Sequence, residues 1–221
     1  KAYSNMGSSI TFKELDKLSM QFACYLQKTL GLTKGERVAI MLPNIIQYPV
    51  AMCGILRAGL VVVNVNPLYT PRELKHQLSD SGATCIIILD NFAATLEEII
   101  SDTNVNHIIL TGVGDMLDFP KNFIVNFVLR YIKKVVPRYS FSSSISFKES
   151  LIKGNNLELD AINIGYGDIA FLQYTGGTTG PSKGAMLTHR NMVANLEQSN
   201  AATKNVYEVG KEIMVTALPL Y

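Results

Sequence analysis

Apolar residues near the start of the chain recur at intervals of three and four positions. The residues in this pattern are Leu15, Leu18, Phe22 and Leu26. Such spacing predicts a helix with one apolar face that packs against a core. Thr11 is the expected N-cap, because Glu14 follows three positions later and allows a capping box. Gly31 marks the expected end of the helix.

Short apolar runs then alternate with helical segments up to residue 112. The runs cover 37–43, 60–66, 84–90 and 107–112, and the segments with helical spacing cover 49–59, 70–82 and 92–102. Pro71, directly after Thr70, suits the first turn of a helix. The runs are continuous stretches of Val, Ile and Leu, which is typical of parallel strands buried on both faces. The pattern therefore predicts an α/β fold with a mostly parallel sheet and helices on both faces.

Residues 113–141 break this alternation and form a basic segment that is rich in aromatic residues. Its apolar residues at helical spacing are Phe119, Phe123, Ile124, Phe127, Val128, Tyr131, Ile132 and Val135. Its basic residues are Lys121, Arg130, Lys133, Lys134 and Arg138, and no acidic residue follows Asp118 within the segment. We expect a helix that starts near Pro120 and ends at Pro137.

Two interpretations of this segment stay open at the level of the sequence. The first is a core helix with a solvated basic edge. The second is a helix that lies on an anionic membrane surface, with Lys133, Lys134 and Arg138 as candidate contacts. Each cation near such a surface contributes on the order of 1 kcal/mol, so the binding would be reversible and sensitive to salt.

Composition narrows the class of protein. The chain has 221 residues, of which 48% are hydrophobic and 17% charged, and this favours a folded protein with a sizeable core. The net charge of +2 gives no indication of a nucleic-acid partner. The three cysteines, Cys24, Cys53 and Cys85, are widely spaced in apolar sequence. They indicate reduced thiols in a cytosolic protein, with no metal site expected.

No targeting segment or membrane span is expected. Residues 1–7 lead into polar sequence without the apolar stretch of a signal peptide. The apolar stretch 45–63 contains Gln47, Pro49 and Arg57, so a helix followed by a buried strand explains it better than a membrane span. We expect a cytoplasmic protein, with peripheral binding to the inner face of the cell membrane as a further hypothesis. The missing initial methionine and the ending in mid-pattern predict a fragment of a longer protein.

The segment TGGTTGPSKG, residues 175–184, carries the strongest indication of chemistry. It contains four glycines, three threonines and one lysine. The apolar residues of 168–174 predict a strand before it. Residues 184–188 predict a second strand, and a helix that Thr188 caps follows. A turn needs only one or two glycines, so we expect a ligand to approach this backbone closely.

These residue types together suit a polyphosphate. Glycines leave backbone N–H groups free to surround an anion, and threonine hydroxyls and Lys183 add donors and a positive charge. Charge-assisted hydrogen bonds contribute roughly 1.5–3 kcal/mol each, and micromolar binding needs roughly 8 kcal/mol, so a few such bonds suffice. The segment lacks the Walker A spacing, because Ser182 precedes Lys183 and Gly184 follows it. The alternative is a flexible hairpin without a ligand.

The stretch YTGGTTGPSKGAMLTHRN resembles the phosphate-binding signature of the adenylate-forming superfamily, which includes acyl-CoA synthetases, luciferases and peptide-synthetase adenylation domains. Ser182 stands where that signature commonly has proline. The stretches LTKGERVAIMLPN, CGILRAGLVVVNVNPLYTPRELKHQLSDSGA and MVTALPLY are similar to other parts of the N-terminal half of these enzymes. The basic segment 113–141 makes the resemblance greatest to bacterial long-chain fatty-acid–CoA ligases.

The resemblance implies the layered α/β/α fold of the acyl-CoA synthetases and a two-step reaction. A carboxylate attacks the α-phosphate of ATP to give an acyl-adenylate and pyrophosphate, and coenzyme A then displaces AMP. It implies that Mg²⁺ assists, and that the β- and γ-phosphates bind to Thr175, Gly176, Gly177, Thr178, Thr179, Gly180 and Lys183. Tyr221 would lie at the margin of the acyl site.

The resemblance also implies a division of the chain. Residues 1–112 would form the helix–strand region, 113–141 the basic insertion and 166–221 the phosphate-loop hairpin with its helix. The rest of the AMP-binding domain and the C-terminal domain would be absent, so this fragment would be inactive and expose apolar surface. We expect a homodimer in the parent protein.

Other functional assignments are weaker. His76, His107 and His189 lack the spacing of metal ligands, and the first is expected on an exposed helix. Turn and helix-start roles explain Tyr69 and Arg72, and Asp168 is expected in a turn. A positioning role for His189 stays open. The rival functions are adenylation of an aryl, amino or short-chain acid, and a non-catalytic module that binds nucleotide or membrane.

Overall fold

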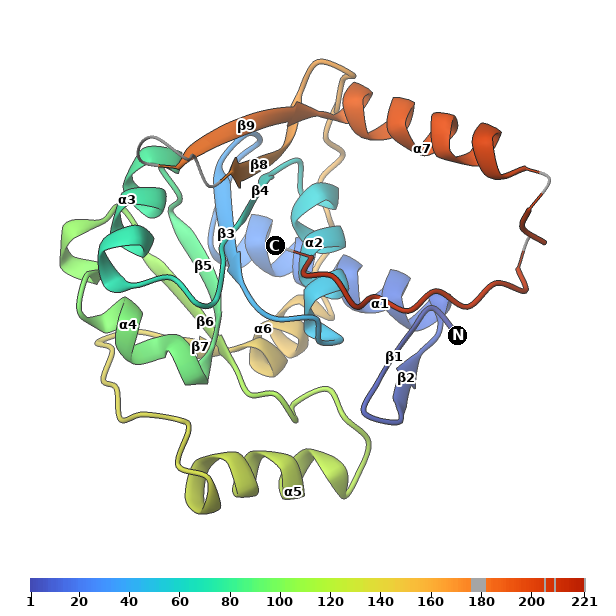
Figure 1. The fold of residues 1–221 in the computed structure, drawn as a ribbon. Coiled ribbons are helices and arrows are strands. Elements are labelled where there is room, and N and C mark those ends of the chain that lie inside the picture. The colour runs from blue at the N-terminus through green and yellow to red at the C-terminus, as the bar shows by residue number, and fades with distance from the viewer. Residues whose placement is uncertain (176–181, 205, 209, 221) are drawn as a thin grey trace.

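A seven-stranded sheet forms the centre of the computed structural model, which describes residues 1–175, 182–204, 206–208 and 210–220 (Figure 1). The strand order is β7-β6-β5-β3-β4-β8-β9. The strands are β3 (Arg37–Met41), β4 (Val61–Asn64), β5 (Cys85–Leu89), β6 (His107–Thr111), β7 (Ile145–Ser146), β8 (Ile169–Thr175) and β9 (Lys183–Thr188). All neighbouring pairs are parallel except β8 and β9, which are antiparallel.

Helices cover both faces of this sheet, which confirms the predicted fold class. Residues of β3 alternate between two cores: Val38 and Ile40 face one cluster, and Ala39 and Met41 face the other. The first cluster packs under α1 (Phe12–Cys24), α2 (Gln47–Arg57) and α6 (Phe147–Gly154), and the second under α3 (Pro71–Ser81) and α4 (Ala93–Glu97). Burial on both faces explains why the strands read as unbroken Val, Ile and Leu.

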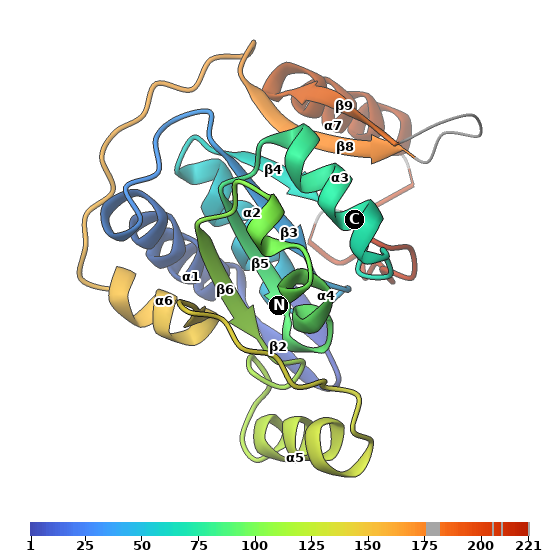
Figure 2. The same cartoon turned by 90° about the vertical axis from the view of Figure 1, so that its left-hand side faces the viewer.

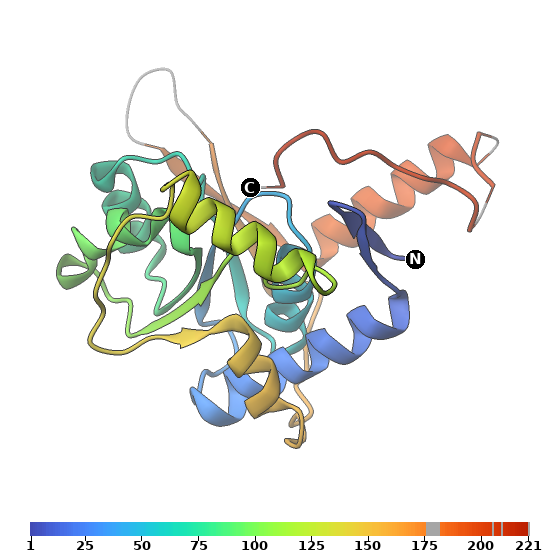
Figure 3. The ribbon, with the colours of Figure 1, turned by 90° about the horizontal axis from the view of Figure 1, so that it is seen from below.

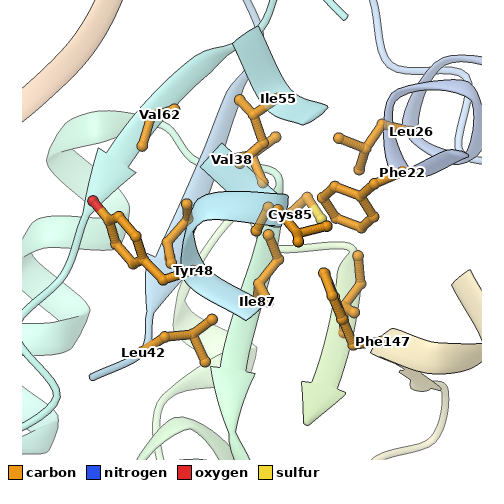
Figure 4. Packing of buried hydrophobic residues seen from close by; sticks show 14 of the residues in the cluster. Phe22, Leu26, Val38, Leu42, Tyr48, Ile55, Val62, Cys85, Ile87 and Phe147 are labelled. Atoms are coloured by element: carbon orange, nitrogen blue, oxygen red, sulfur yellow. The ribbon is translucent and has the colours of Figure 1, made fainter. Parts of the chain in front are cut away.

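Close contact between helices shapes the first cluster. The rings of Phe22 on α1 and Phe147 on α6 lie 5.0 Å apart between centroids, and both side chains are fully buried (Figure 4). Gly54 on α2 leaves room for the Phe22 ring, because a Cβ at this position would lie 2.8 Å from Phe22 Cδ1. The small residue thus lets the two helices approach each other.

The ends of the helices follow the predicted capping chemistry. Thr11 and Thr70 each form a capping box with the glutamate three positions later, before α1 and α3 respectively. Pro71 occupies the first turn of α3, and Gly82 ends it with a left-handed φ of +65°. The last turn of the first helix is π-helical over Tyr25–Thr29, and Gly31 follows with a φ of +70°.

Several short elements were not predicted. The strands β1 (Tyr3–Asn5) and β2 (Ser8–Ile10) form a separate hairpin. The two-residue strand β7 and the helix α6 had no recognised pattern, although Ser146 caps α6 through the backbone N–H of Glu149. The helix predicted over 92–102 is wrong in length, because α4 covers only Ala93–Glu97 between 3₁₀ turns.

The basic segment stands apart from the sheet (Figures 1 and 2). It forms α5 (Lys121–Phe127), which continues as a π-helical turn over Val128–Ile132, and none of these residues is buried. The interpretation as a core helix is therefore wrong. The expected end at Pro137 is also wrong, because helical structure stops at Ile132 and Lys134 adopts a left-handed φ of +52°. In the view from below, α5 lies across the outside of the molecule (Figure 3).

No helix within the described ranges has both the length and the hydropathy needed to cross a lipid bilayer.

Candidate functional site

The glycine-rich segment connects two paired strands at the edge of the sheet. Thr175, the last residue of β8, is the cross-strand partner of Lys183, the first residue of β9. Both side chains are exposed. The structure therefore brings together the first and last of the predicted phosphate-binding residues. The others, Gly176, Gly177, Thr178, Thr179 and Gly180, lie outside the described residues, as does Tyr221.

This pair lies at the carboxyl end of the parallel strands, where α/β sheets commonly bind ligands. Strand β4 runs parallel to β8, and Asn64 at its end pairs in register with Gln173. The Asn64 Nδ2 group donates a hydrogen bond of 2.8 Å to Gln173 Oε1. Asn64 was not predicted as a site residue, although a polar residue within the apolar run 60–66 could have indicated a polar contact here.

Helix α3 contacts β8 and the residue that precedes β9, and the ribbon runs beside these strands (Figures 1 and 2). The Tyr174 hydroxyl donates to Asp80 Oδ2 at 2.6 Å, and His76 Nε2 lies 3.0 Å from the carbonyl oxygen of Ser182. The sequence predicts His76 on an exposed helix, but its side chain is half-buried and makes this contact. Burial and the bond to Asp80 raise the pKa of Tyr174, which keeps the phenol protonated.

The ring of Tyr174, the cross-strand partner of residue 184, explains why this position is a glycine. A Cβ at this position would lie 2.9 Å from Tyr174 Cε2 and 3.0 Å from its Cζ. The ring therefore lies against bare backbone, and a larger residue would displace it. Thus Gly184 supports the geometry of the hairpin.

The residues around β8 and β9 have structural roles. Asp168 Oδ2 accepts from the Gly165 backbone N–H at 2.6 Å and pairs with Lys34 at 2.6 Å. The bond from Lys34 lowers the pKa of Asp168. Thr188 caps α7 (His189–Thr203) through a capping box with Asn191. The predicted turn role of Asp168 and the predicted cap of Thr188 are confirmed.

A second cluster of polar side chains binds the segment that precedes Tyr221. Asn44 Nδ2 donates to the carbonyl of Leu218 at 2.7 Å, and the Leu220 N–H donates to Asn44 Oδ1 at 3.0 Å. The Tyr48 hydroxyl oxygen lies 2.7 Å from the Leu220 carbonyl and 2.8 Å from Asn64 Oδ1. Burial raises the pKa of Tyr48 to about 12. Asn64 therefore connects this segment to β8, a link that the sequence did not indicate.

The cysteines and the possible metal ligands add no further candidate site in the part of the chain that the structure describes. Burial raises the pKa of Cys24, Cys53 and Cys85, whose thiols are free and poor nucleophiles when protonated. Across the described ranges, no three or more His, Cys, Asp or Glu residues form a group that could hold a metal ion.

A cleft of about 510 Å³ lies between α5 and the carboxyl ends of β5 and β6. Polar contacts cross it: Arg130 pairs with Asp90 at 3.0 Å, and Asn126 Nδ2 donates to Asp115 Oδ1 at 2.8 Å. Burial raises the pKa of Asp90, although Arg130 opposes this shift. These polar bonds connect α5 and its last turn to the segments that follow β5 and β6, and the rings of Phe127 and Tyr131 also line the cleft.

Comparisons with known proteins agree with this arrangement. The family described as AMP-binding enzyme matches residues 1–221. A long-chain-fatty-acid–CoA ligase of Escherichia coli O6:H1 is 58% identical over 220 residues, which cover 100% of this chain and 39% of that protein. A ligase of the same name from Bacillus subtilis is 39% identical over 222 residues, again 100% of this chain and 39% of that protein. The chain thus spans about 39% of the length of these curated relatives.

Solved structures show the same fold. A long-chain-fatty-acid–CoA ligase from Archaeoglobus fulgidus has a TM-score of 0.68 and 27% identity, and the match covers 92% of this chain and 35% of that one. Apo MatB from Rhodopseudomonas palustris has a TM-score of 0.71 at 21% identity, over 97% of this chain and 36% of that one. The second likeness concerns the fold alone.

Proposed function

The chain belongs to the AMP-binding enzyme family, and on that premise we propose that it carries the ATP-phosphate site of a long-chain fatty-acid–CoA ligase. The observation that supports this most is the pairing of Thr175 with Lys183 at the carboxyl edge of the sheet, on either side of a glycine-rich stretch of sequence. The 58% identity with the Escherichia coli ligase supports the choice of reaction.

The proposed reaction proceeds in two steps in the complete polypeptide. A carboxylate oxygen of the fatty acid attacks the α-phosphorus of ATP, the bond to the β-phosphate breaks, and pyrophosphate leaves. The thiol of coenzyme A then loses its proton to solvent, its sulfur attacks the acyl carbon, and AMP leaves with the electron pair of the acyl–oxygen bond. Negative charge accumulates on the departing pyrophosphate, and the fixed donors near it lower the barrier.

The residues of this chain supply those donors. The Lys183 ammonium would bind the β- and γ-phosphates together with the Thr175 hydroxyl and the backbone of the loop. Mg²⁺ would neutralise part of the phosphate charge, and it commonly binds through substrate phosphates with few protein ligands. The neighbouring Thr175 supplies a hydroxyl oxygen, a donor type that fits such an ion.

Long-chain fatty acids are the proposed substrates because relatives of 54–58% identity carry that name. The alternative substrate is another carboxylic acid. The 29% identity with a 4-coumarate–CoA ligase from Narcissus pseudonarcissus supports this alternative. Residues 218–220, held by Asn44 and Tyr48, would border the acyl site beside Tyr221.

We also propose that α5 and the residues around it bind an anionic membrane surface in a cytoplasmic protein. Phe119, Phe123 and Tyr131 are 80%, 68% and 62% exposed. Lys133, Lys134 and Arg138 are exposed close to them. A helix that presents aromatic and basic side chains together suits the interface of an anionic bilayer.

Exposed apolar side chains also occur on β9, α7 and the segment after it. They include Met186, Val193, Leu196, Ile213, Met214, Val215 and Leu218. Apolar surface of this extent favours packing against further polypeptide. We propose that the remainder of the AMP-binding domain covers this apolar surface in the complete protein. We also propose that the complete protein forms a homodimer. Light scattering on that protein would measure the molar mass, and a monomer mass would contradict the homodimer.

A pyrophosphate-release assay tests the proposed reaction. The complete polypeptide that contains this chain would be supplied with ATP, Mg²⁺ and acetate, octanoate, palmitate or benzoate in turn. We expect release with palmitate to exceed release with the other acids, and Lys183→Gln to reduce it. Preference for benzoate would favour the alternative substrate class, and no release with any carboxylate would contradict the assignment as a ligase.

A further inference from the structure

Helix α3 presents two polar side chains to the strands on either side of the glycine-rich segment. His76 and Asp80 are four residues apart, so they lie on the same face of the helix. Asp80 accepts the hydroxyl of Tyr174, one residue before Thr175, at 2.6 Å. His76 Nε2 lies 3.0 Å from the carbonyl oxygen of Ser182, one residue before Lys183. One helix turn thus holds both ends of the segment.

The two contacts act on strands that are already fixed to each other. Tyr174 pairs with Gly184 across β8 and β9, and its ring lies against the glycine backbone. The phenol stays protonated because burial and Asp80 raise its pKa, so it is the donor in the bond to the carboxylate. At His76, the acceptor is a carbonyl oxygen, so Nε2 must carry the proton.

Helix α3 itself is anchored firmly enough to act as a support. Leu74 and Leu78 are fully buried in the second core cluster. Gln77, also buried, donates from Nε2 to the carbonyl of Asn64 at 2.6 Å, which ties the helix to the end of β4. The capping box at Thr70 and the left-handed Gly82 define its two ends. Functional geometry is most precise when rigid elements support it.

We propose that His76 and Asp80 are positioning residues that hold the two ends of the glycine-rich segment at the separation a polyphosphate requires. The inference rests on the proposed function, since it assigns these residues to the same ATP-phosphate site. They act through Tyr174 and Ser182 and do not touch the nucleotide themselves. Fixing the ends in advance reduces the ordering cost that ATP binding would otherwise incur.

Matched substitutions in the complete polypeptide test this inference. His76→Ala and Asp80→Ala each remove one contact, whereas His76→Gln keeps a donor and Asp80→Asn keeps an acceptor. Ser79→Ala on the exposed face of α3 is the control. We expect each alanine variant at His76 or Asp80 to raise the KM for ATP about five- to tenfold, with the KM for the carboxylate unchanged within about twofold. The Gln and Asn variants should recover most of the loss.

Hydrogen exchange provides a readout that does not depend on catalysis. Without ATP, the amides of residues 174–188 should exchange faster in His76→Ala and Asp80→Ala than in the wild type or in Ser79→Ala. Absence of pyrophosphate release by the wild type would contradict the proposed function, and the exchange result would still decide the positioning role. Unchanged exchange together with an unchanged KM for ATP would overturn the inference, as would an equal rise in both KM values.

Discussion

Replacing Lys133, Lys134 and Arg138 together by glutamine tests the proposed membrane surface. All three side chains are exposed. Arg130 is left in place because it pairs with Asp90, and so is Lys121, which donates to the Met6 carbonyl at 3.3 Å. The triple variant thus removes cations without disturbing the polar contacts that hold α5 to the sheet.

The expected effect follows from the charge removed. Each basic residue near an anionic surface contributes about 1 kcal/mol, so three contribute about 3 kcal/mol. This corresponds to a loss of roughly 100- to 200-fold in the partition coefficient, since 1.4 kcal/mol is a factor of ten. The exposed aromatic side chains would retain a weaker affinity that does not depend on lipid charge.

Sedimentation with vesicles of phosphatidylcholine, with and without phosphatidylglycerol, measures that partition. The matched control replaces Lys13, Lys17 and Lys148 by glutamine, which are also exposed and lie on α1 and α6. Both triple variants change the formal net charge of the chain from +2 to −1, because each removes three positive charges (2 − 3 = −1). A general effect of net charge would therefore weaken both variants equally.

The wild type and the control should bind anionic vesicles and be released by high salt, because salt screens the attraction. The variant at Lys133, Lys134 and Arg138 should bind far more weakly. Equal partition of all three proteins would refute the membrane interpretation of α5. Equal weakening of the two variants would show that net charge, and not this surface, attracts the vesicles.

Three further substitutions test the packing of the fold and the site. Gly184→Ala should lower the free energy of unfolding in urea by about 1–3 kcal/mol, because the new Cβ displaces the Tyr174 ring; the same loss in a Tyr174→Ser background would disprove the steric cause. Phe147→Ala should lower it by about 3–5 kcal/mol, since the ring is fully buried against Phe22, and a loss below about 1 kcal/mol would contradict that packing. Thr70→Ala should lower it by about 1 kcal/mol through loss of the α3 N-cap, whereas Thr70→Ser should be nearly neutral if the hydroxyl is responsible.

Local chemistry made much of the fold predictable. The capping residue Thr70, together with Pro71 and Gly82, predicts the two ends of α3 from local sequence alone. The buried strands were also predictable, because parallel strands that are covered on both faces are apolar throughout. Segment 113–141 could not be resolved in this way, since helical spacing of apolar residues is the same on a core helix and on a helix that faces a membrane. Only the structure, in which no residue of Lys121–Ile132 is buried, excluded the core helix.

Some residues of the candidate site were likewise predictable from the sequence, and others were not. Lys183 and the threonines were recognisable because glycine, hydroxyl and ammonium groups together indicate a polyphosphate. His76 was not, because its partner is a backbone carbonyl 106 positions away, and a backbone contact leaves no pattern in the sequence. Tyr48 was hidden for a related reason: it lies within an apolar stretch, and its link to Leu220 depends on how the chain returns to α2.

The central claim is that the glycine-rich hairpin holds the phosphates of ATP. A crystal structure of the complete polypeptide with Mg²⁺ and AMP-imidodiphosphate tests it most directly. The account predicts the β- and γ-phosphates within hydrogen-bonding distance of Lys183 Nζ and Thr175 Oγ1, with the loop between these residues folded around them. Well-ordered phosphates bound elsewhere on the protein, with this hairpin free of ligand, would contradict it.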